Sequence, residues 1–187
     1  MWEQLKRIIK PNGAIVLFGS EPFSSALRMS NIKQYKYDWI WAKHHTWQLN
    51  SKKQPLRNYE CISVFYSSQC RYNPQFSKWA PYEIKRVWYK WSETLWKQRD
   101  HTTVSNWLRF PKQILEYKEK MTIHPTQKPV ALIEYLIKTY TNEWETVLDF
   151  TAGSFTTAVA CENTNRKWIC IEQDETYFNI WIKRLWY

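Results

Sequence analysis

Glycine is scarce in this chain of 187 residues, which has 3 glycines where average usage predicts about 13. Adjacent prolines are absent although there are 8 prolines, and no Cys-x-x-Cys pair occurs. Each of Cys61, Cys70, Cys161 and Cys170 lies in or beside an apolar stretch. We therefore expect buried thiols, and we predict neither a metal site nor disulfides.

Long apolar runs are missing as well. No stretch approaches the ~18 consecutive apolar residues of a membrane-spanning helix, and the N-terminal segment lacks the apolar run of a signal peptide. We expect a soluble, cytoplasmic protein with no membrane partner. The length predicts a single domain covering residues 1–187.

Positive charge is concentrated in the middle of the chain. The whole sequence has 27 Lys and Arg against 17 Asp and Glu, a formal net charge of +10. Residues 31–120 hold 17 basic and 7 acidic side chains, and this difference equals the net charge of +10 of the whole chain. Residues 121–187 hold 6 basic and 8 acidic side chains. This distribution favours a polyanionic partner such as nucleic acid.

Helices and strands are expected to alternate at both ends of the chain. The stripe of Trp2, Leu5 and Ile8 predicts a helix, and a buried strand is predicted to follow it. Strands are expected at 14–18, 37–42, 61–66, 146–150 and 167–172, and later helices at 129–140, 156–164 and 175–186. Strand, helix and strand with short connections predict a parallel α/β sheet. Residues 71–120 show no sustained period and are expected to form loops and short elements.

The stretch "VLDFTAGSFTT" places Gly153 between a predicted strand and a predicted helix. In open α/β sheets a ligand lies beyond the carboxyl end of a strand, where glycine lets the backbone approach it and a helix N-terminus presents N–H groups. Glu172 follows Asp149 by 23 residues, close to the ~20-residue spacing at which a carboxylate meets ribose hydroxyls. The pattern predicts a pocket for an adenosine-containing cofactor, but a single glycine fits a structural turn equally well.

The segment "HPTQKP" at 124–129, followed by a helix, "DFTAGS" and "IEQDETYF", resembles the site-specific DNA amino-methyltransferases. These are the N6-adenine and N4-cytosine DNA methylases in which the target-recognition segment precedes the cofactor loop. "KPNGAIVLFGS", "DWIWAK", "KQPLRNYECISVFY" and "RFPKQIL" extend the resemblance over most of the chain. It implies a Rossmann-like, circularly permuted α/β methyltransferase fold, with an irregular target-recognition insertion at about 71–120. It also implies S-adenosyl-L-methionine as cofactor and double-stranded DNA as partner.

The same resemblance assigns roles to individual residues. It places Glu172 on the ribose, and Thr126 and Lys128 near the methionine end. The residues that it places along the cofactor are Phe150, Ala152, Gly153 and Ser154. The full set of implied cofactor-binding residues is His124, Thr126, Lys128, Asp149, Phe150, Thr151, Ala152, Gly153, Ser154, Thr156 and Glu172. Plainer roles stay open: Thr126 as a helix cap, Asp149 as a cap of the glycine loop, and Phe150 and Phe155 as packing residues.

Two features depart from the family pattern. Phe155 stands where many members have a second glycine, so the loop must either bend away from the cofactor or pack the phenyl ring over it. The catalytic tetrapeptide, which is Asp, Asn or Ser followed by Pro-Pro and an aromatic residue, is absent, so no catalytic residue is assigned. In relatives this motif precedes the segment that matches Met1 and stacks on a flipped base. The chain is therefore expected to be N-terminally truncated and inactive by itself.

The resemblance also predicts the order of strands. The strand containing Val147 to Phe150 should be central in one sheet with the strand at 14–18. Its neighbours should be the strand at 167–172 and a gap where the strand that carries the missing motif belongs.

Tryptophan is as abundant as glycine is rare, with 13 residues. Trp47, Trp91, Trp96, Trp107 and Trp144 stand where a turn or a glycine is expected. We hypothesise that UGA codons that encode glycine in the source have been translated as tryptophan. The alternative is that these rings stack on bases, as aromatic side chains in a basic region can.

Three functions are compatible with these observations. The first is a methyltransferase acting on N6 of adenine or N4 of cytosine in DNA. The second is a non-catalytic DNA-binding or specificity protein derived from such an enzyme. The third, an unrelated nucleotide-binding protein such as an oxidoreductase, explains neither "HPTQKP" nor the central charge. The recognition sequence, the target base, the oligomeric state and the existence of a cognate restriction endonuclease are left open.

Overall fold

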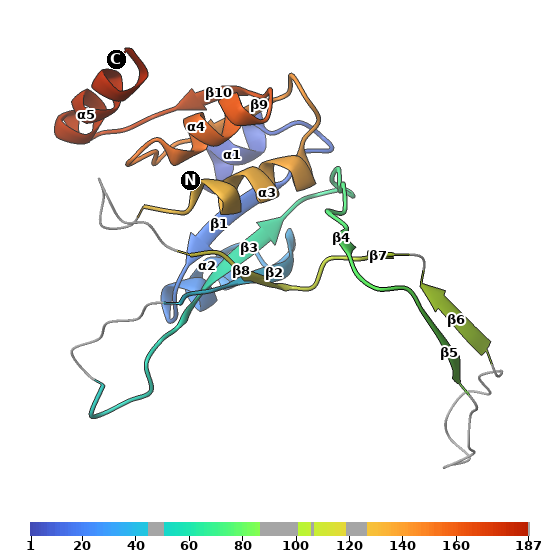
Figure 1. Cartoon of the computed structure of the whole chain (residues 1–187). Coiled ribbons are helices and arrows are strands. Elements are labelled where there is room, and N and C mark those ends of the chain that lie inside the picture. The colour runs from blue at the N-terminus through green and yellow to red at the C-terminus, as the bar shows by residue number, and fades with distance from the viewer. Residues whose placement is uncertain (45–50, 87–100, 106, 119–126, 187) are drawn as a thin grey trace. The chain divides into compact units, whose positions relative to one another are not determined.

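The computed structural model describes residues 1–44, 51–86, 101–105, 107–118 and 127–186 (Figure 1). These residues divide into two compact units. The larger unit comprises Met1–Asn73 and Lys112–Tyr187, and the smaller unit comprises Pro74–Pro111. Each unit is described by itself.

The larger unit contains a four-stranded sheet with the order β1-β3-β2-β8. β1 (Ile15–Gly19) and β2 (Tyr35–Ala42) each pair antiparallel with β3 (Tyr59–Phe65), and β8 (Ile114–Glu116) pairs parallel with β2. The sheet is therefore mixed. β3 lies between two neighbours, and its Ile62, Val64 and Phe65 are fully buried, which explains why this strand reads as a nearly continuous apolar run.

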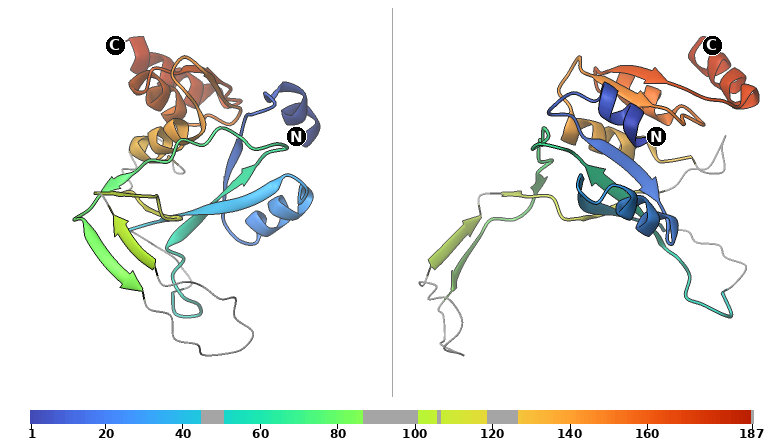
Figure 2. Two further views of the ribbon diagram at one scale, coloured as in Figure 1. Left: turned by 90° about the vertical axis from the view of Figure 1, so that its right-hand side faces the viewer. Right: turned by 180° about the vertical axis from the view of Figure 1, so that it is seen from behind.

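Helices cover both faces of this sheet (Figure 2). On one face, α3 (Val130–Tyr140) packs Leu132 and Leu136 against Trp39 and Ile62. On the other face, α1 (Trp2–Ile8) and α2 (Phe23–Ser30) contribute to a cluster built on Ile15 and Phe65. Full burial of a large apolar side chain contributes about 1.5–3 kcal/mol to the free energy of folding. Side chains buried under helices on both faces therefore stabilise the sheet.

A second, two-stranded sheet follows α3. β9 (Thr146–Asp149) and β10 (Lys167–Cys170) are parallel, and α4 (Thr156–Asn163) connects them. Ala160 and Cys161 of α4 pack against Ile133 and Ile137 of α3. The chain then continues into α5 (Glu175–Trp186). The predicted strand–helix–strand unit and its parallel pairing are confirmed.

The predicted position of β9 in the sheet is wrong. β1 and β9 lie in separate sheets, and among the described strands β9 pairs only with β10 while β1 pairs only with β3. Phe18 of β1 and Val147 of β9 nevertheless pack into the same cluster on α3. Among the described residues, no backbone pairing connects β1 with β9. The two strands are connected through this side-chain cluster instead. The predicted break in pairing beside β9 is present.

The smaller unit consists of short antiparallel ribbons. β4 (Ser77–Lys78) pairs with β7 (Leu108–Arg109), and β5 (Tyr82–Arg86) pairs with β6 (His101–Ser105). The rings of Phe76 and Phe110 lie 4.8 Å apart, and the guanidinium of Arg109 lies 5.0 Å from the ring centroid of Trp79. Short elements without a regular period are what the sequence of this region predicts.

The prediction of buried thiols is confirmed for three of the four cysteines. Cys61, Cys70 and Cys161 are buried, Cys170 is half-buried, and all four are free thiols. Burial raises the pKa of the Cys161 and Cys170 thiols to about 12. Across the described ranges, no group of three or more His, Cys, Asp or Glu side chains is arranged to hold a metal ion. No helix in those ranges is long and apolar enough to cross a membrane.

Two tryptophans occupy backbone conformations that favour glycine. Trp107 has a φ of 63° and Trp144 a φ of 67°, in the left-handed region that costs a residue with a Cβ atom about 1–2 kcal/mol. Both side chains are exposed, at 62% and 69%, so burial of the ring does not compensate. The backbone therefore supports the hypothesis that these positions belong to glycine. Trp47, Trp91 and Trp96 lie outside the described residues.

Candidate cofactor site

Asp149 caps the loop that follows β9. Its Oδ1 accepts a hydrogen bond of 3.1 Å from the backbone N–H of Thr151, and its Oδ2 accepts one of 2.6 Å from Oγ1 of Thr157. Both carboxylate oxygens are therefore engaged within the loop and the first turn of α4. This is the plainer of the two roles that the sequence allowed for Asp149.

Gly153 and Glu172 meet across the ends of the two parallel strands. The Gly153 N–H donates a 2.6 Å hydrogen bond to Oε2 of Glu172, and the Asp174 N–H donates one of 2.8 Å to Oε1. The hydrogen bond from Asp174, with that from Gly153, holds the pKa of the Glu172 carboxyl below its ordinary value. Gly153 has a φ of 51°, which glycine adopts without strain. Gly153 and Glu172, 19 residues apart in the sequence, are thus in direct contact.

The loop turns most of its side chains inward. Ala152, Ser154 and Thr156 are buried, and the Ser154 and Thr156 hydroxyls lie 2.9 Å apart at the start of α4. Thr151 is exposed and Phe150 is half-buried. Phe150 packs beside the cluster of Leu5 and Ile15. A ligand on this loop would therefore meet mainly backbone groups of residues 152–154 rather than their side chains.

The Phe155 side chain packs against α5. Its ring is 1% exposed and stacks on Trp181, with centroids 4.2 Å apart and planes at 19°. Its φ of 54° is left-handed, as expected at a position where relatives carry glycine. The ring points into an apolar cluster that includes Ala158, so the backbone bears the strain while the side chain is buried.

Lys128 lies in a second cluster at the carboxyl ends of β1 and β2. Its Nζ is 2.9 Å from Oε2 of Glu60. It also lies 5.3 Å from the ring centroid of Phe18 and 5.6 Å from that of Trp41. Lys43 forms an ion pair with the other oxygen of Glu60, and its Nζ is 4.9 Å from the Trp41 ring. His124 and Thr126 lie outside the described residues.

Sequence reasoning missed Glu60, Lys43 and Trp41 as members of this cluster. Glu60 pairs directly opposite Trp41 in the sheet, and its side chain is only 14% exposed. The signal was present in "ECISVF", where a carboxylate begins an otherwise apolar strand. A buried carboxylate needs partners to offset its desolvation.

Both clusters lie at carboxyl ends of strands in the larger unit. The glycine loop and Glu172 follow the carboxyl ends of β9 and β10, and the lysine cluster follows those of β1 and β2. Ligands of open α/β folds bind at this edge.

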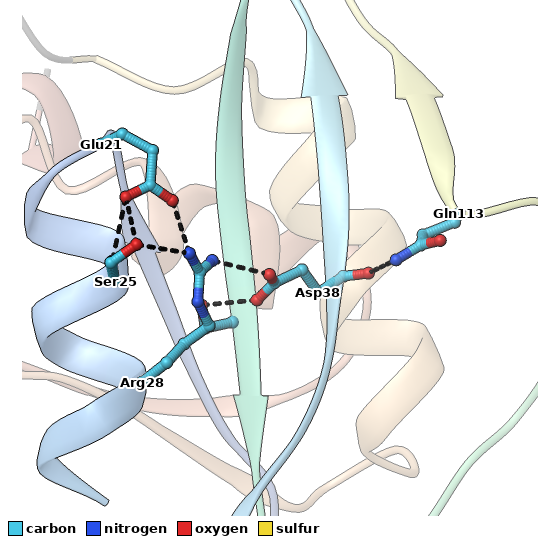
Figure 3. A network of polar contacts seen from close by, with 6 residues as sticks. Glu21, Ser25, Arg28, Asp38 and Gln113 are labelled. Carbon is cyan, nitrogen blue, oxygen red and sulfur yellow. Dashed lines mark hydrogen bonds and ion pairs between the residues drawn. The ribbon is translucent and has the colours of Figure 1, made fainter. Parts of the chain in front are cut away.

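An open depression of about 580 Å³ lies elsewhere, between α2 and the sheet. Arg28 crosses its floor, with Nη1 2.8 Å from Oδ2 of Asp38 and Nη2 hydrogen-bonded to Glu21 and Ser25 (Figure 3). Gln113, just before β8, donates a 2.6 Å hydrogen bond to the backbone oxygen of Asp38. These contacts tie α2, β2 and β8 together, and none of them involves a residue predicted to bind cofactor.

The glycine loop suits an adenosine-containing cofactor. Each oxygen of Glu172 accepts one backbone hydrogen bond, and a carboxylate has about four acceptor positions. Acceptor capacity for two ribose hydroxyls therefore remains on a carboxylate whose orientation is already fixed. A glycine beside it leaves room for close approach of the ligand, so the residues present fit the group.

Comparison with known proteins places the chain. The family model described as DNA methylase, of the N6/N4 type, matches residues 1–183. The type II methyltransferase M2.DpnII of Streptococcus pneumoniae is 29% identical over 98% of this chain and 65% of its own length. M2.LlaDCHI of Lactococcus lactis subsp. cremoris is 29% identical over 98% of this chain and 64% of its length. The chain thus spans just under two thirds of these relatives.

A solved structure agrees with the sequence matches. The M1.HpyAVI–SAM complex has a TM-score of 0.64 and 27% identity, and the alignment covers 98% of this chain and 81% of that one. The predicted Rossmann-like methyltransferase fold is confirmed, although its sheet is divided in two here. The match over residues 1–183, together with the glycine loop and its carboxylate, identifies the chain as a member of the N6/N4 DNA methylase family.

Proposed function

We propose that this chain provides the cofactor pocket and the target-recognition region of a site-specific DNA methyltransferase. The reaction is transfer of a methyl group from S-adenosyl-L-methionine to the exocyclic amine of adenine (N6) or cytosine (N4). The observation that carries this proposal is the fixed Glu172 carboxylate beside the Gly153 loop, at the strand edge where α/β folds bind ligands. Family membership over residues 1–183 supports it.

In this pocket the chain's own residues bind and orient. The Glu172 carboxylate accepts hydrogen bonds from the ribose hydroxyls, and the backbone of Ala152, Gly153 and Ser154 lines the adjacent surface. Asp149 keeps the loop closed through Thr151 and Thr157. Thr126 and Lys128 are proposed to lie near the methionine end, and His124 is proposed to bind the same cofactor. The bound cofactor supplies an electrophilic methyl group, and fixed alignment of that group with the amine provides much of the rate.

Double-stranded DNA is the proposed substrate. Residues 31–120 would attract the DNA phosphates, because their excess of basic over acidic side chains equals the net positive charge of the whole chain. Within them, residues 71–120 form the proposed target-recognition region, which includes the smaller unit. Phosphate contacts from lysine and arginine would set the register, and base contacts would give the specificity. The cytoplasmic location expected from the sequence stays a prediction.

The 187 residues by themselves are proposed to be inactive. They contain no Pro-Pro pair, so the aromatic ring and the acceptor that hold a flipped base are missing. A base must leave the stack before a side chain can reach its amine. The break in pairing between β1 and β9 is where a strand carrying that motif would fit.

The test is transfer of a labelled methyl group to mixed-sequence DNA. The chain alone should transfer negligible label, whereas the chain preceded by a segment that carries the Pro-Pro-aromatic motif should transfer it readily. Robust transfer by the 187 residues would show that the catalytic residues are misplaced in this proposal. Binding of DNA and cofactor by the extended protein without any transfer would favour the second candidate, a non-catalytic specificity protein, which the absence of the motif supports.

A further inference from the structure

β4 and β7 form a two-stranded antiparallel ribbon within the smaller unit (Figure 1). Lys78 of β4 pairs with Leu108 of β7. The register continues outward to Phe76 and Phe110, whose ring centroids lie 4.8 Å apart. Directly opposed residues share a face of a ribbon, and so do residues two apart along one strand. One face, which we call the phenylalanine face, therefore consists of Phe76, Lys78, Leu108 and Phe110.

The opposite face of the ribbon has contacts of its own. The guanidinium of Arg109 lies 5.0 Å from the ring centroid of Trp79, and the Trp79 indole N–H donates a 3.1 Å hydrogen bond to Oγ of Ser77. Ser77 and Arg109 are paired across the ribbon. These are the residues that the alternation of side chains places together, so the contacts confirm which residues belong to each face.

The phenylalanine face is exposed although most of it is apolar. Phe76, Leu108 and Phe110 are 45%, 53% and 72% exposed, and Lys78 is exposed beside them. Neighbouring apolar side chains left on a surface commonly mark a binding site. The two phenyl rings contact each other with their planes at 55°, so they leave no space for a base to stack between them. A partner would meet the outer sides of the rings.

Charge and dimensions favour duplex DNA as the partner of this face. Residues 74–111 hold 7 basic and 3 acidic side chains, a balance that is complementary to phosphates. The major groove of B-DNA admits a two-stranded β-ribbon, and three or four side chains are enough to read base edges there. A protein partner fits less well, because four side chains make a small interface and lysine is depleted from interface cores.

The chemistry of the face selects one feature of the groove. Phenyl and leucyl side chains form no hydrogen bonds with base edges. The apolar group that the major groove presents is the C5-methyl of thymine, which phenylalanine contacts in protein–DNA complexes. The ammonium group of Lys78 suits a phosphate. The face therefore combines apolar contact with thymine and charge contact with the DNA backbone.

We propose that the phenylalanine face reads thymine in the major groove, with Phe76, Leu108 and Phe110 in contact with thymine methyl groups. Lys78 contacts a neighbouring phosphate in this arrangement. The inference rests on the proposed function. It goes beyond that function by assigning a preference for thymine to named residues outside the cofactor pocket.

The experiment compares two labelled, mixed-sequence duplexes that contain either thymine or uracil and are otherwise identical. Uracil keeps the hydrogen-bonding groups of thymine and lacks its methyl group. The thymine preference is the Kd for the uracil duplex divided by the Kd for the thymine duplex. Fluorescence anisotropy at one fixed salt concentration measures both constants for the whole 187-residue protein. We expect a preference of about fourfold for each methyl group that the face buries.

Three variants separate the roles of the side chains. The double variant Phe76→Ala/Phe110→Ala should bring the thymine preference close to one. Trp79→Ala is the matched control, because it removes an aromatic ring from the opposite face of the same ribbon and should keep the preference. Lys78→Ala should weaken binding of both duplexes equally and reduce the slope of log affinity against log salt by about one. The preference of the unaltered protein decides the question even if the double variant does not fold.

Equal affinity of the unaltered protein for the two duplexes would overturn the inference and leave the proposed methyl transfer standing. A preference that survives in the double variant, or that Trp79→Ala abolishes equally, would also overturn it. Analytical ultracentrifugation tests the competing occupant: self-association that the double variant abolishes, with no change in preference, would assign the face to a second copy of this chain. Binding of neither duplex would contradict the proposed DNA-binding role of residues 71–120 as well, so the two failures are distinguishable.

Discussion

The backbone N–H of Gly153 lies 2.6 Å from Oε2 of Glu172, so a glycine from one strand's end and a carboxylate from the next strand's end are joined directly. The contact exists because β9 and β10 are parallel and adjacent, with Asp149 paired to Cys170. Residues that follow the same edge of two neighbouring strands must come close together. This contact and the hydrogen bond from the Asp174 N–H fix the orientation of the Glu172 carboxylate.

We expect Glu172→Ala to weaken binding of S-adenosyl-L-methionine by about tenfold or more, since charge-assisted hydrogen bonds to the ribose would be lost. Calorimetric titration measures the change. Glu134→Ala is the control, because Glu134 is also a partly exposed carboxylate that accepts one hydrogen bond, from Asn163. Equal affinity in the Glu172 variant and the unaltered protein would remove Glu172 from the site.

Trp144→Gly should stabilise the protein. Trp144 is 69% exposed at a φ of 67°, and relief of left-handed strain is worth about 1 kcal/mol. Urea unfolding measures the free energy. Trp144→Ala is the matched control, because alanine removes the ring and retains the Cβ atom that causes the strain. Glycine should exceed alanine by about 1 kcal/mol, and equal stability of the two variants would contradict the argument.

The gene provides a direct check on the same positions. We expect UGA codons at Trp107 and Trp144, the two tryptophans with positive φ among the described residues. UGG codons at both positions would contradict the recoding hypothesis and leave the positive φ of Trp107 and Trp144 unexplained by the sequence. Reading the codons requires no protein.

Stability should fall in acid partly through Glu60. Burial raises the pKa of this carboxyl, but the Lys128 ammonium and the hydrogen bond from Lys43 outweigh burial and hold the pKa below the ordinary 4.5. A lowered folded-state pKa means that the ionised form stabilises the fold above pH 4.5, and that this contribution disappears as the pH falls through the folded value.

Thermal unfolding between pH 3 and pH 7 measures this effect. Glu60→Gln should melt at a lower temperature than the unaltered protein near neutrality, and the difference should shrink in acid. A difference that is independent of pH would mean that the charge of Glu60 does not contribute to stability.

DNA binding should depend strongly on salt. Each phosphate contact made by lysine or arginine releases counterions, so affinity for duplex DNA should fall by orders of magnitude between about 50 and 200 mM salt if several contacts form. Fluorescence anisotropy with a labelled duplex measures the slope. Weak binding that is insensitive to salt would speak against the basic region 31–120 as the DNA-binding surface.

Local structure followed from local patterns. The stripe of Leu132, Ile133, Leu136 and Ile137 predicted α3, and Pro129 marked its start, because residues three to four apart share one face of a helix. Most other predicted helices and strands were confirmed within one or two residues. α2 and β8 were missed: α2 is short and only Leu27 of its apolar side chains is buried, and β8 has three residues with one buried.

The sequence by itself determined the family, the order of the elements along the chain, and the assignment of Gly153 and Glu172 to one candidate site, because a motif and its spacing are properties of the chain alone. The division into two sheets, the stacking of Phe155 on Trp181, and the pairing of Glu60 with Lys43 and Lys128 were decided by the tertiary structure alone. Each of these joins segments that only folding brings together. Whether a strand edge is paired, or a buried charge is balanced, depends on neighbours that no local pattern specifies.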